Sequence, residues 1–116
     1  MAGQAGAQQV AVPSGLEVRL FEVRLEEEPQ LARFRFVVPA IDPAGEAKTF
    51  GDVVDDLQYL CDAVVVPALA QNAWTGAQVV LSLASAESEF GFYDESVMQF
   101  FQPFRIEAAA CVWEDY

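Results

Sequence analysis

The fold of this 116-residue chain is decided by residues 49–64, TFGDVVDDLQYLCDAV. Apolar residues recur there at intervals of three and four, which places them on one stripe of an α-helix: Phe50, Val53, Val54, Leu57, Leu60, Cys61 and Val64. Thr49 and Asp52 form the T-x-x-D pattern of a helix start. The other aspartates of the stretch are expected to face water, with Cys61 pointing inward: Asp55, Asp56 and Asp62.

The residues after this stretch predict a second, shorter helix. Val66 precedes Pro67, and a residue before proline is disfavoured in the α region, so the first helix is expected to break there. A short helix is then expected from Pro67 to Gln71, because proline is tolerated in a first helical turn. Gln78 to Ala84 alternates apolar side chains on both faces, as in a well-buried strand.

The segment before the helix predicts an antiparallel hairpin. Apolar and charged residues alternate from Leu16 to Leu25, and a one-residue change of phase near Leu20 indicates a β-bulge. Residues 26–30 form a solvated turn, and residues 34–38 alternate as a second strand, followed by a loop over 39–48. The hairpin's arginines are expected to pair with Glu22 and its neighbours on the solvent face: Arg24, Arg33 and Arg35.

The end of the chain predicts a closing hairpin. Phe104 to Glu107 alternates, Ala108-Ala109 follows, and Cys111 and Trp113 end the pattern. The alternative is a helical stripe, made by Val97, Phe100, Phe101 and Phe104. The predicted fold is a single α+β domain over residues 16–116, an antiparallel sheet of four or five strands with one main helix packed on one face.

Charge restricts the classes of partner. The chain has 18 Asp and Glu against 6 Lys and Arg, for a net charge of -12, so its field repels nucleic-acid phosphates and anionic lipid headgroups. No apolar stretch approaches the roughly 18 residues of a spanning helix. We expect no nucleic-acid partner and no membrane insertion. The charge would suit a basic protein or cations, although its commonest use is solubility.

The first fifteen residues are predicted to be a flexible N-terminus. Residues 5–7, Ala-Gly-Ala, followed by Gln8, fit the small-x-small pattern of a signal-peptide cleavage site, so the segment is either a signal remnant or a cytosolic tail. The two cysteines, Cys61 and Cys111, suit one disulfide, with two buried thiols as the alternative. Together these features favour a periplasmic or otherwise exported protein over a cytoplasmic one.

Motifs of catalysis and cofactor binding are missing. The sequence has no histidine, neither glycine-rich nucleotide motif and no C-x-x-C pair. Asp52, Asp55 and Asp56 share part of one helix but lack the EF-hand order, and such carboxylates usually form a solvated face. We therefore predict no catalytic, cofactor-binding or metal-binding residues, and no enzyme.

One loop is a candidate partner-binding site. Residues 86–96 are acidic and aromatic without a clean period, which predicts an ordered loop. We expect its rings to complete the core; the alternative is a partner-binding edge with exposed rings. The candidate residues are Glu87, Glu89, Phe90, Phe92, Tyr93, Asp94 and Glu95.

A family resemblance spans most of the chain after residue 16. The segments that carry it are FRFVVP (34–39), DLQYLCD (56–62), QFF (99–101), FRIE (104–107) and CVWE (111–114). With these segments the chain resembles an uncharacterised family of small exported proteins from the Rhodobacter group of bacteria. The resemblance implies a leader peptide, a periplasmic location and a Cys61 to Cys111 disulfide. It also implies a glycine-containing turn where this chain has Ala108-Ala109.

The resemblance brings one functional label, since such proteins are sometimes called acetolactate synthase-like. A chain this short cannot hold a thiamine-diphosphate domain, and no cofactor motif is present. We expect a periplasmic, non-catalytic binding or interaction domain with a protein or small-molecule partner and no cofactor. One alternative is a small cytosolic metabolite-binding regulatory module with a pocket between helix and sheet. Another is an acidic decoy for a basic partner, with carboxylates clustered on one face.

Overall fold

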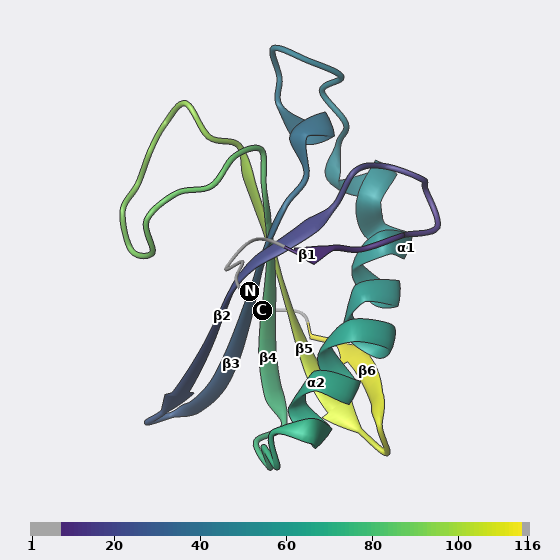
Figure 1. The fold of residues 1–116 in the computed structure, drawn as a ribbon, viewed down its shortest axis with the longest axis vertical. Helices are drawn as coiled ribbons and strands as arrows, with labels where there is room; N and C mark the ends of the chain where they lie inside the picture. Colours follow the sequence, from purple (N-terminus) through teal and green to yellow (C-terminus); the bar gives the residue numbers. More distant parts are fainter. Residues whose placement is uncertain (1–7, 115–116) are drawn as a thin grey trace.

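The protein is an α+β domain in which a six-stranded sheet carries one helical stretch on one face (Figure 1). The computed structural model describes residues 8–114. Within them the strands follow the sheet order β1-β2-β3-β4-β5-β6. Their bounds are β1 Gln8–Gln9, β2 Arg19–Glu27, β3 Gln30–Val37, β4 Gln78–Ala84, β5 Gln99–Glu107 and β6 Ala110–Trp113.

The predicted sheet was wrong in two respects. The described residues form six strands rather than four or five. The strand that the sequence did not predict is β1, whose two residues are too few to show an alternating pattern. The sheet is also mixed, since β3 and β4 pair in parallel while every other neighbouring pair is antiparallel. The helices between β3 and β4 return the chain to the end of the sheet where β3 began, and that return makes the pair parallel.

The segment predicted as a flexible N-terminus is described from residue 8 onward, and residues 1–7, with the cleavage-like pattern, lie outside the described residues. Gln8 and Gln9 pair with Leu20 and Arg19 of β2. Val10 and Val12 then pack against the core. Residues 8–15 thus contact both the sheet and the core.

The predicted hairpins are present. β2 and β3 pair with a register shift between Leu20 and Glu22, which confirms the bulge. β5 and β6 form the closing hairpin, so residues 99–107 are a strand and not the helical alternative. Ala108 and Ala109 turn the chain at φ values of 51° and 63°, in the left-handed region that favours glycine. The expected glycine-containing turn is thus built from two alanines.

The helical stretch is continuous, and the predicted break before Pro67 is wrong. It consists of α1 Phe50–Leu60, a π-helical turn η2 Cys61–Val65 and α2 Val66–Gln71. Val66 keeps helical dihedrals, and its N–H donates to Cys61 O, five residues back. This wider turn accommodates Pro67, which has no N–H and whose ring would clash in a regular α-helix. The short helix after the proline and the Thr49–Asp52 capping box are confirmed.

The π turn also keeps the apolar stripe on one face. Several buried residues of the helix lie four apart: Val53, Leu57, Cys61, Val65 and Leu69. In a regular α-helix each step of four residues overshoots a full turn by about 40°, so such a series would drift around the helix. A wider turn in the middle reverses part of that drift. The whole series therefore stays against the sheet.

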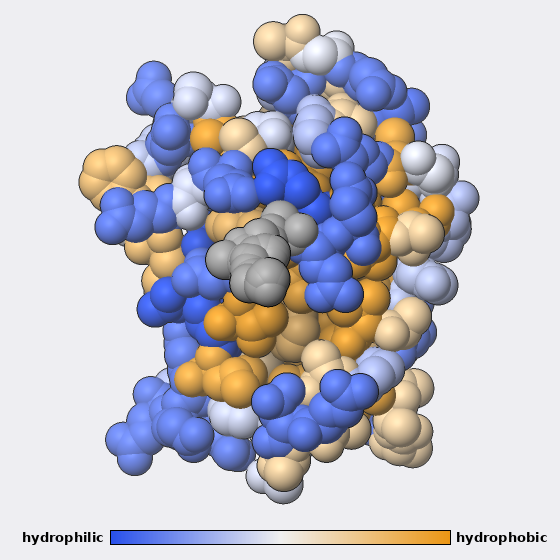
Figure 2. Space-filling model, viewed as in Figure 1, coloured by the Kyte–Doolittle hydropathy of each residue, from blue (hydrophilic) through white to orange (hydrophobic). Residues whose placement is uncertain are grey.

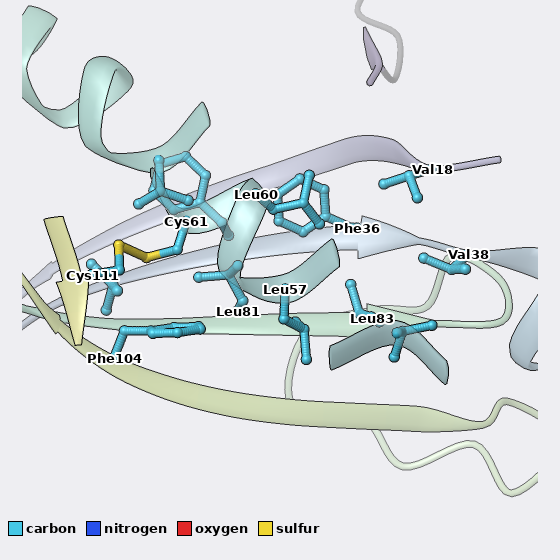
Figure 3. Packing of buried hydrophobic residues seen from close by; sticks show 14 of the residues in the cluster. Val18, Phe36, Val38, Leu57, Leu60, Cys61, Leu81, Leu83, Phe104 and Cys111 are labelled. Atoms are coloured by element: carbon cyan, nitrogen blue, oxygen red, sulfur yellow. A yellow bond between two sulfur atoms is a disulfide. The ribbon is translucent and has the colours of Figure 1, made fainter. Parts of the chain in front are cut away.

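The core lies between this stripe and the inner face of the sheet (Figure 3). Leu57 and Leu60 meet Phe36, Leu81 and Leu83, all with 1% exposure or less. A short 3₁₀ helix, η1 Pro39–Ile41, adds Ile41 at one end. In the described residues, no helix is both long enough and apolar enough to cross a membrane.

The inner face extends past the cover of the helices along β2. Figure 2 shows hydrophobic side chains gathered between the sheet and the helices. Val23 and Leu25 pair with the core residues Phe34 and Ala32, yet they remain 44% and 42% exposed. The helices thus cover the middle of the inner face and leave part of β2 open.

A disulfide joins the helix to the last strand. Cys61 and Cys111 are bridged with a Cα–Cα distance of 6.0 Å, so the alternative of two buried thiols does not apply. Hydrogen bonds reinforce the link: Asp62 Oδ1 accepts from Cys111 N at 2.8 Å, and Gln58 Nε2 donates to Cys111 O at 2.9 Å. Trp113 Nε1 donates to Gln58 Oε1 at 2.5 Å. One helical turn therefore holds β6 by covalent and polar contacts.

Candidate binding groove

The outer face of the sheet, opposite the helices, carries charged and apolar side chains in rows. Arg35 of β3 pairs in register with Glu22, and through Ser82 the row continues to Phe101 of β5. A second row runs through Arg24, Arg33, Val80 and Pro103. Because side chains alternate between the two faces of a strand, residues beside the core positions point to this side.

Residues 85–98, here called the outer loop, connect β4 to β5 and project on this outer side (Figure 1). Its ends are tied together, since Ser85 N donates to Met98 O at 2.9 Å and Met98 N donates to Ser85 Oγ at 3.0 Å. Its first half is fixed to the sheet by Arg19, which contacts Glu87 at 2.5 Å, and by Arg35 Nη2, which donates to Ser88 O at 3.1 Å. The predicted ordered loop is thus held at several points.

Phe90 of the outer loop lies among three arginines. The guanidinium carbon of Arg24 is 3.9 Å from the centre of its ring, and those of Arg33 and Arg35 are each 5.4 Å away. Cations at these distances are attracted to the negative face of the ring. Phe90 therefore stacks on the arginines and does not enter the core.

The arginines pair with glutamates of the same hairpin, as the sequence predicts. Arg24 and Arg35 both bind Glu22, and Arg33 Nε is 3.1 Å from Glu26. The predicted solvent exposure was wrong for Arg35, which is only 7% exposed because the outer loop covers it. Partial burial raises the pKa of Glu22, but the hydrogen bonds and charges of Arg35 and Arg24 outweigh it, so this pKa lies below its ordinary value.

Glu22 should therefore make stability depend on pH. A carboxyl whose pKa is lowered by folding stabilises the protein above its unfolded pKa, and this contribution is lost as the pH falls through the lowered folded value. We expect Glu22→Gln to lower the free energy of unfolding by about 1 kcal/mol at neutral pH and by much less near about pH 3. Urea unfolding across this range measures the difference. Glu28→Gln, at the exposed hairpin turn, is the control, and a penalty for Glu22→Gln that is constant with pH would contradict the assignment.

A groove of about 620 Å³ separates the outer loop from the outer face. Its apolar lining combines strand and loop residues: Val80, Phe92, Tyr93, Val97, Met98 and Phe101. Phe101, Phe92 and Tyr93 are 59%, 67% and 82% exposed, so the expectation that the loop's rings complete the core is wrong. The structure places the candidate loop residues at this groove or beside it, while their partner-binding role stays a prediction.

The acidic side chains at the groove belong to the outer loop. Glu89 and Glu95 line the groove, with Asp94 between Tyr93 and Glu95 in the sequence. Within residues 8–114, none of the observed ion pairs involves these three side chains. Hydrogen bonds from the side chain and backbone of Ser96 lower the pKa of Asp94, which keeps it ionised. The rim is therefore negative.

The helix aspartates do not form a second site. Asp52 belongs to the capping box, and Asp55 is exposed. Asp56 was predicted to face water but is 2% exposed, because its carboxylate accepts hydrogen bonds from Ser14 N at 3.0 Å and Ser14 Oγ at 2.5 Å. Across the part of the chain that the structure describes, no group of three or more His, Cys, Asp and Glu residues could hold a metal ion.

Comparison with known protein families gives a match over the whole chain. Residues 1–116 match the model of a protein family described as a family of unknown function (DUF6497), so membership of an uncharacterised family is confirmed, while the Rhodobacter origin, the export and the acetolactate synthase-like label of the expected family stay predictions. No curated protein and no solved structure matches the chain.

Proposed function

We propose that this chain, which belongs to the family of unknown function DUF6497, is an exported, non-catalytic binding domain whose ligand occupies the groove under the outer loop. The observation that carries the proposal is the exposure of several aromatic rings around one groove, above all Phe101 and Tyr93. Apolar side chains gathered at a concave surface mark binding sites more often than scattered exposed ones do.

The construction of the groove supports a binding role. Its volume of about 620 Å³ lies within the usual range of ligand sites, roughly 300 to 1,000 Å³. The outer loop is tied down at its base and at Glu87, Ser88 and Phe90, so the wall is largely formed before a ligand arrives. A preformed wall reduces the conformational entropy that binding would otherwise cost.

Export and the absence of catalysis are supported separately. Disulfides persist in oxidising compartments such as the periplasm, and the bond between Cys61 and Cys111 fits such a location. The sequence has no histidine, the commonest general base, and the groove's arginines are paired with glutamates. This chemistry suits recognition better than bond cleavage.

The neutral fluorophore N-phenyl-1-naphthylamine tests the groove, because its emission rises in apolar surroundings. We expect saturable binding to the disulfide-bonded protein and a loss of affinity of about tenfold in Phe101→Ala, since that ring supplies exposed apolar area. The matched control is Tyr59→Ala, which removes an exposed ring from α1. Absence of saturable binding, or equal losses in both variants, would refute the proposed site.

A further inference from the structure

Resting on the proposed function, we infer that the groove binds a basic, extended segment of a partner protein. An apolar side chain of that segment enters between the outer loop and Phe101. Lysine or arginine side chains beside it lie along the rim carboxylates Glu89 and Glu95, which line the groove, and Asp94, which is adjacent to Glu95 in the chain. Three observations support this assignment: the charge of the groove, the exposure of its rings and the electrostatic field of the whole chain.

The charge of the groove favours a cation over an anion. The guanidinium groups at its floor are already paired, Arg33 with Glu26 and Arg35 with Glu22. Arg35 also donates to Ser88, so its hydrogen-bonding capacity is largely used. By contrast, the rim carboxylates take part in none of the ion pairs found among residues 8–114. An arriving lysine or arginine would therefore gain partners that a carboxylate or phosphate would not find.

The exposure of the rings favours a polypeptide over a small metabolite. Tyr93 and Phe92 stand at the surface, 82% and 67% exposed, while Phe101 lies on β5 and Met98 at the base of the outer loop. A small molecule between loop and sheet would leave the outer rings uncovered. A segment that crosses the loop would cover them, and its cationic groups could stack on the ring faces. Aromatic side chains of this kind commonly dominate the energetics of protein interfaces.

The electrostatic field of the whole chain also favours a basic partner. Its net charge of -12 attracts basic partners over long distances and speeds their association. This attraction alone would not select the groove, so rim carboxylates must be distinguished from carboxylates elsewhere. The chain offers a comparison of equal charge in the exposed residues Glu17, Glu27 and Glu28.

The experiment selects from a phage library of random peptides of about twelve residues on the disulfide-bonded protein, then measures a selected peptide by fluorescence anisotropy. We expect enriched peptides to carry lysine or arginine within two positions of an aromatic or large aliphatic residue. Affinity should fall about tenfold between about 50 and 300 mM salt. The triple variant E89Q/D94N/E95Q should lose about tenfold in affinity, and E17Q/E27Q/E28Q much less, although both change the net charge equally.

The outcomes separate the two proposals. If N-phenyl-1-naphthylamine binds at Phe101 but the selected peptides are acidic or neutral, or no peptide is enriched, the basic-segment inference is overturned while the groove stands. Equal losses in the two triple variants would also overturn it, because general attraction would then explain the binding. If the fluorophore does not bind either, the proposed function itself fails. Peptide binding that weakens in both Phe101→Ala and E89Q/D94N/E95Q, with fluorophore binding unchanged in the latter, supports both.

Discussion

Reduction of the Cys61–Cys111 disulfide is expected to lower the free energy of unfolding by about 4 kcal/mol. The bond links residues 50 positions apart and removes conformational entropy from the unfolded chain, which is the main source of the effect in the simple loop-closure model. The melting temperature should fall by roughly 15 °C for a domain of this size. Urea unfolding with and without a phosphine reductant gives the measurement on an otherwise identical chain.

The control for this experiment is the double variant Cys61→Ser with Cys111→Ser, whose unfolding should not respond to reductant. Alkylation under denaturing conditions, followed by mass measurement, shows whether the protein made in its own host carries the bond. Unfolding curves that coincide with and without reductant would contradict the expected contribution. Free thiols in the host protein would remove the main support for export.

Phe36→Ala is expected to lower the free energy of unfolding by about 4 kcal/mol, whereas Phe101→Ala should cost less than about 1 kcal/mol. Phe36 is fully buried between the inner face and the helix, so its removal loses apolar contacts and leaves a cavity. Phe101 projects into the groove, 59% exposed. The two substitutions remove the same side chain from opposite faces of one sheet, and chemical denaturation compares them directly.

This comparison also tests the groove. A Phe101→Ala penalty as large as that of Phe36→Ala would mean that Phe101 is a core residue, and that its ring is not available to a ligand. A small penalty together with weakened fluorophore binding would place its contribution in recognition rather than in folding.

Local patterns predicted the elements better than their arrangement. The Thr49–Asp52 start, the bulge near Leu20 and most of the stripe from Phe50 to Val64 depend on neighbouring residues, and these are present. The stripe differs at its ends, where Phe50 is exposed and Val65, which was not predicted on it, is buried. The parallel pairing of β3 with β4 depends on the path of the chain through 40 residues between Val37 and Gln78, which no local pattern records. A break was predicted at Pro67 because a residue before proline is disfavoured in a regular α-helix. That rule does not describe a helix with a wider turn.

The groove was predicted only in part, because local patterns do not record which distant segments meet in the fold. The acidic and aromatic composition of residues 87–95 identified one wall, but Val80 was predicted only as part of a buried strand and Phe101 only as part of an alternative helical stripe, while Met98 carried no prediction. One signal could have helped: Phe100 and Phe101 are adjacent on a strand, so their rings must lie on opposite faces. Only one of those faces has a helix to cover it. The burial of Asp56 on the helix was not predicted, because Ser14, which donates hydrogen bonds to its carboxylate, lies 42 positions away in the sequence.

The π turn at residues 61–65 has a consequence for how this chain could have evolved. A single wide turn is what a helix forms when one residue is inserted and the flanking turns keep their places against the core. Such an insertion would place Cys61 and Asp62 opposite β6 and make room for Pro67 without disturbing Leu57 or Leu69. Relatives that lack one residue here should have a regular helix, and a proline at the position of Pro67 would then be selected against.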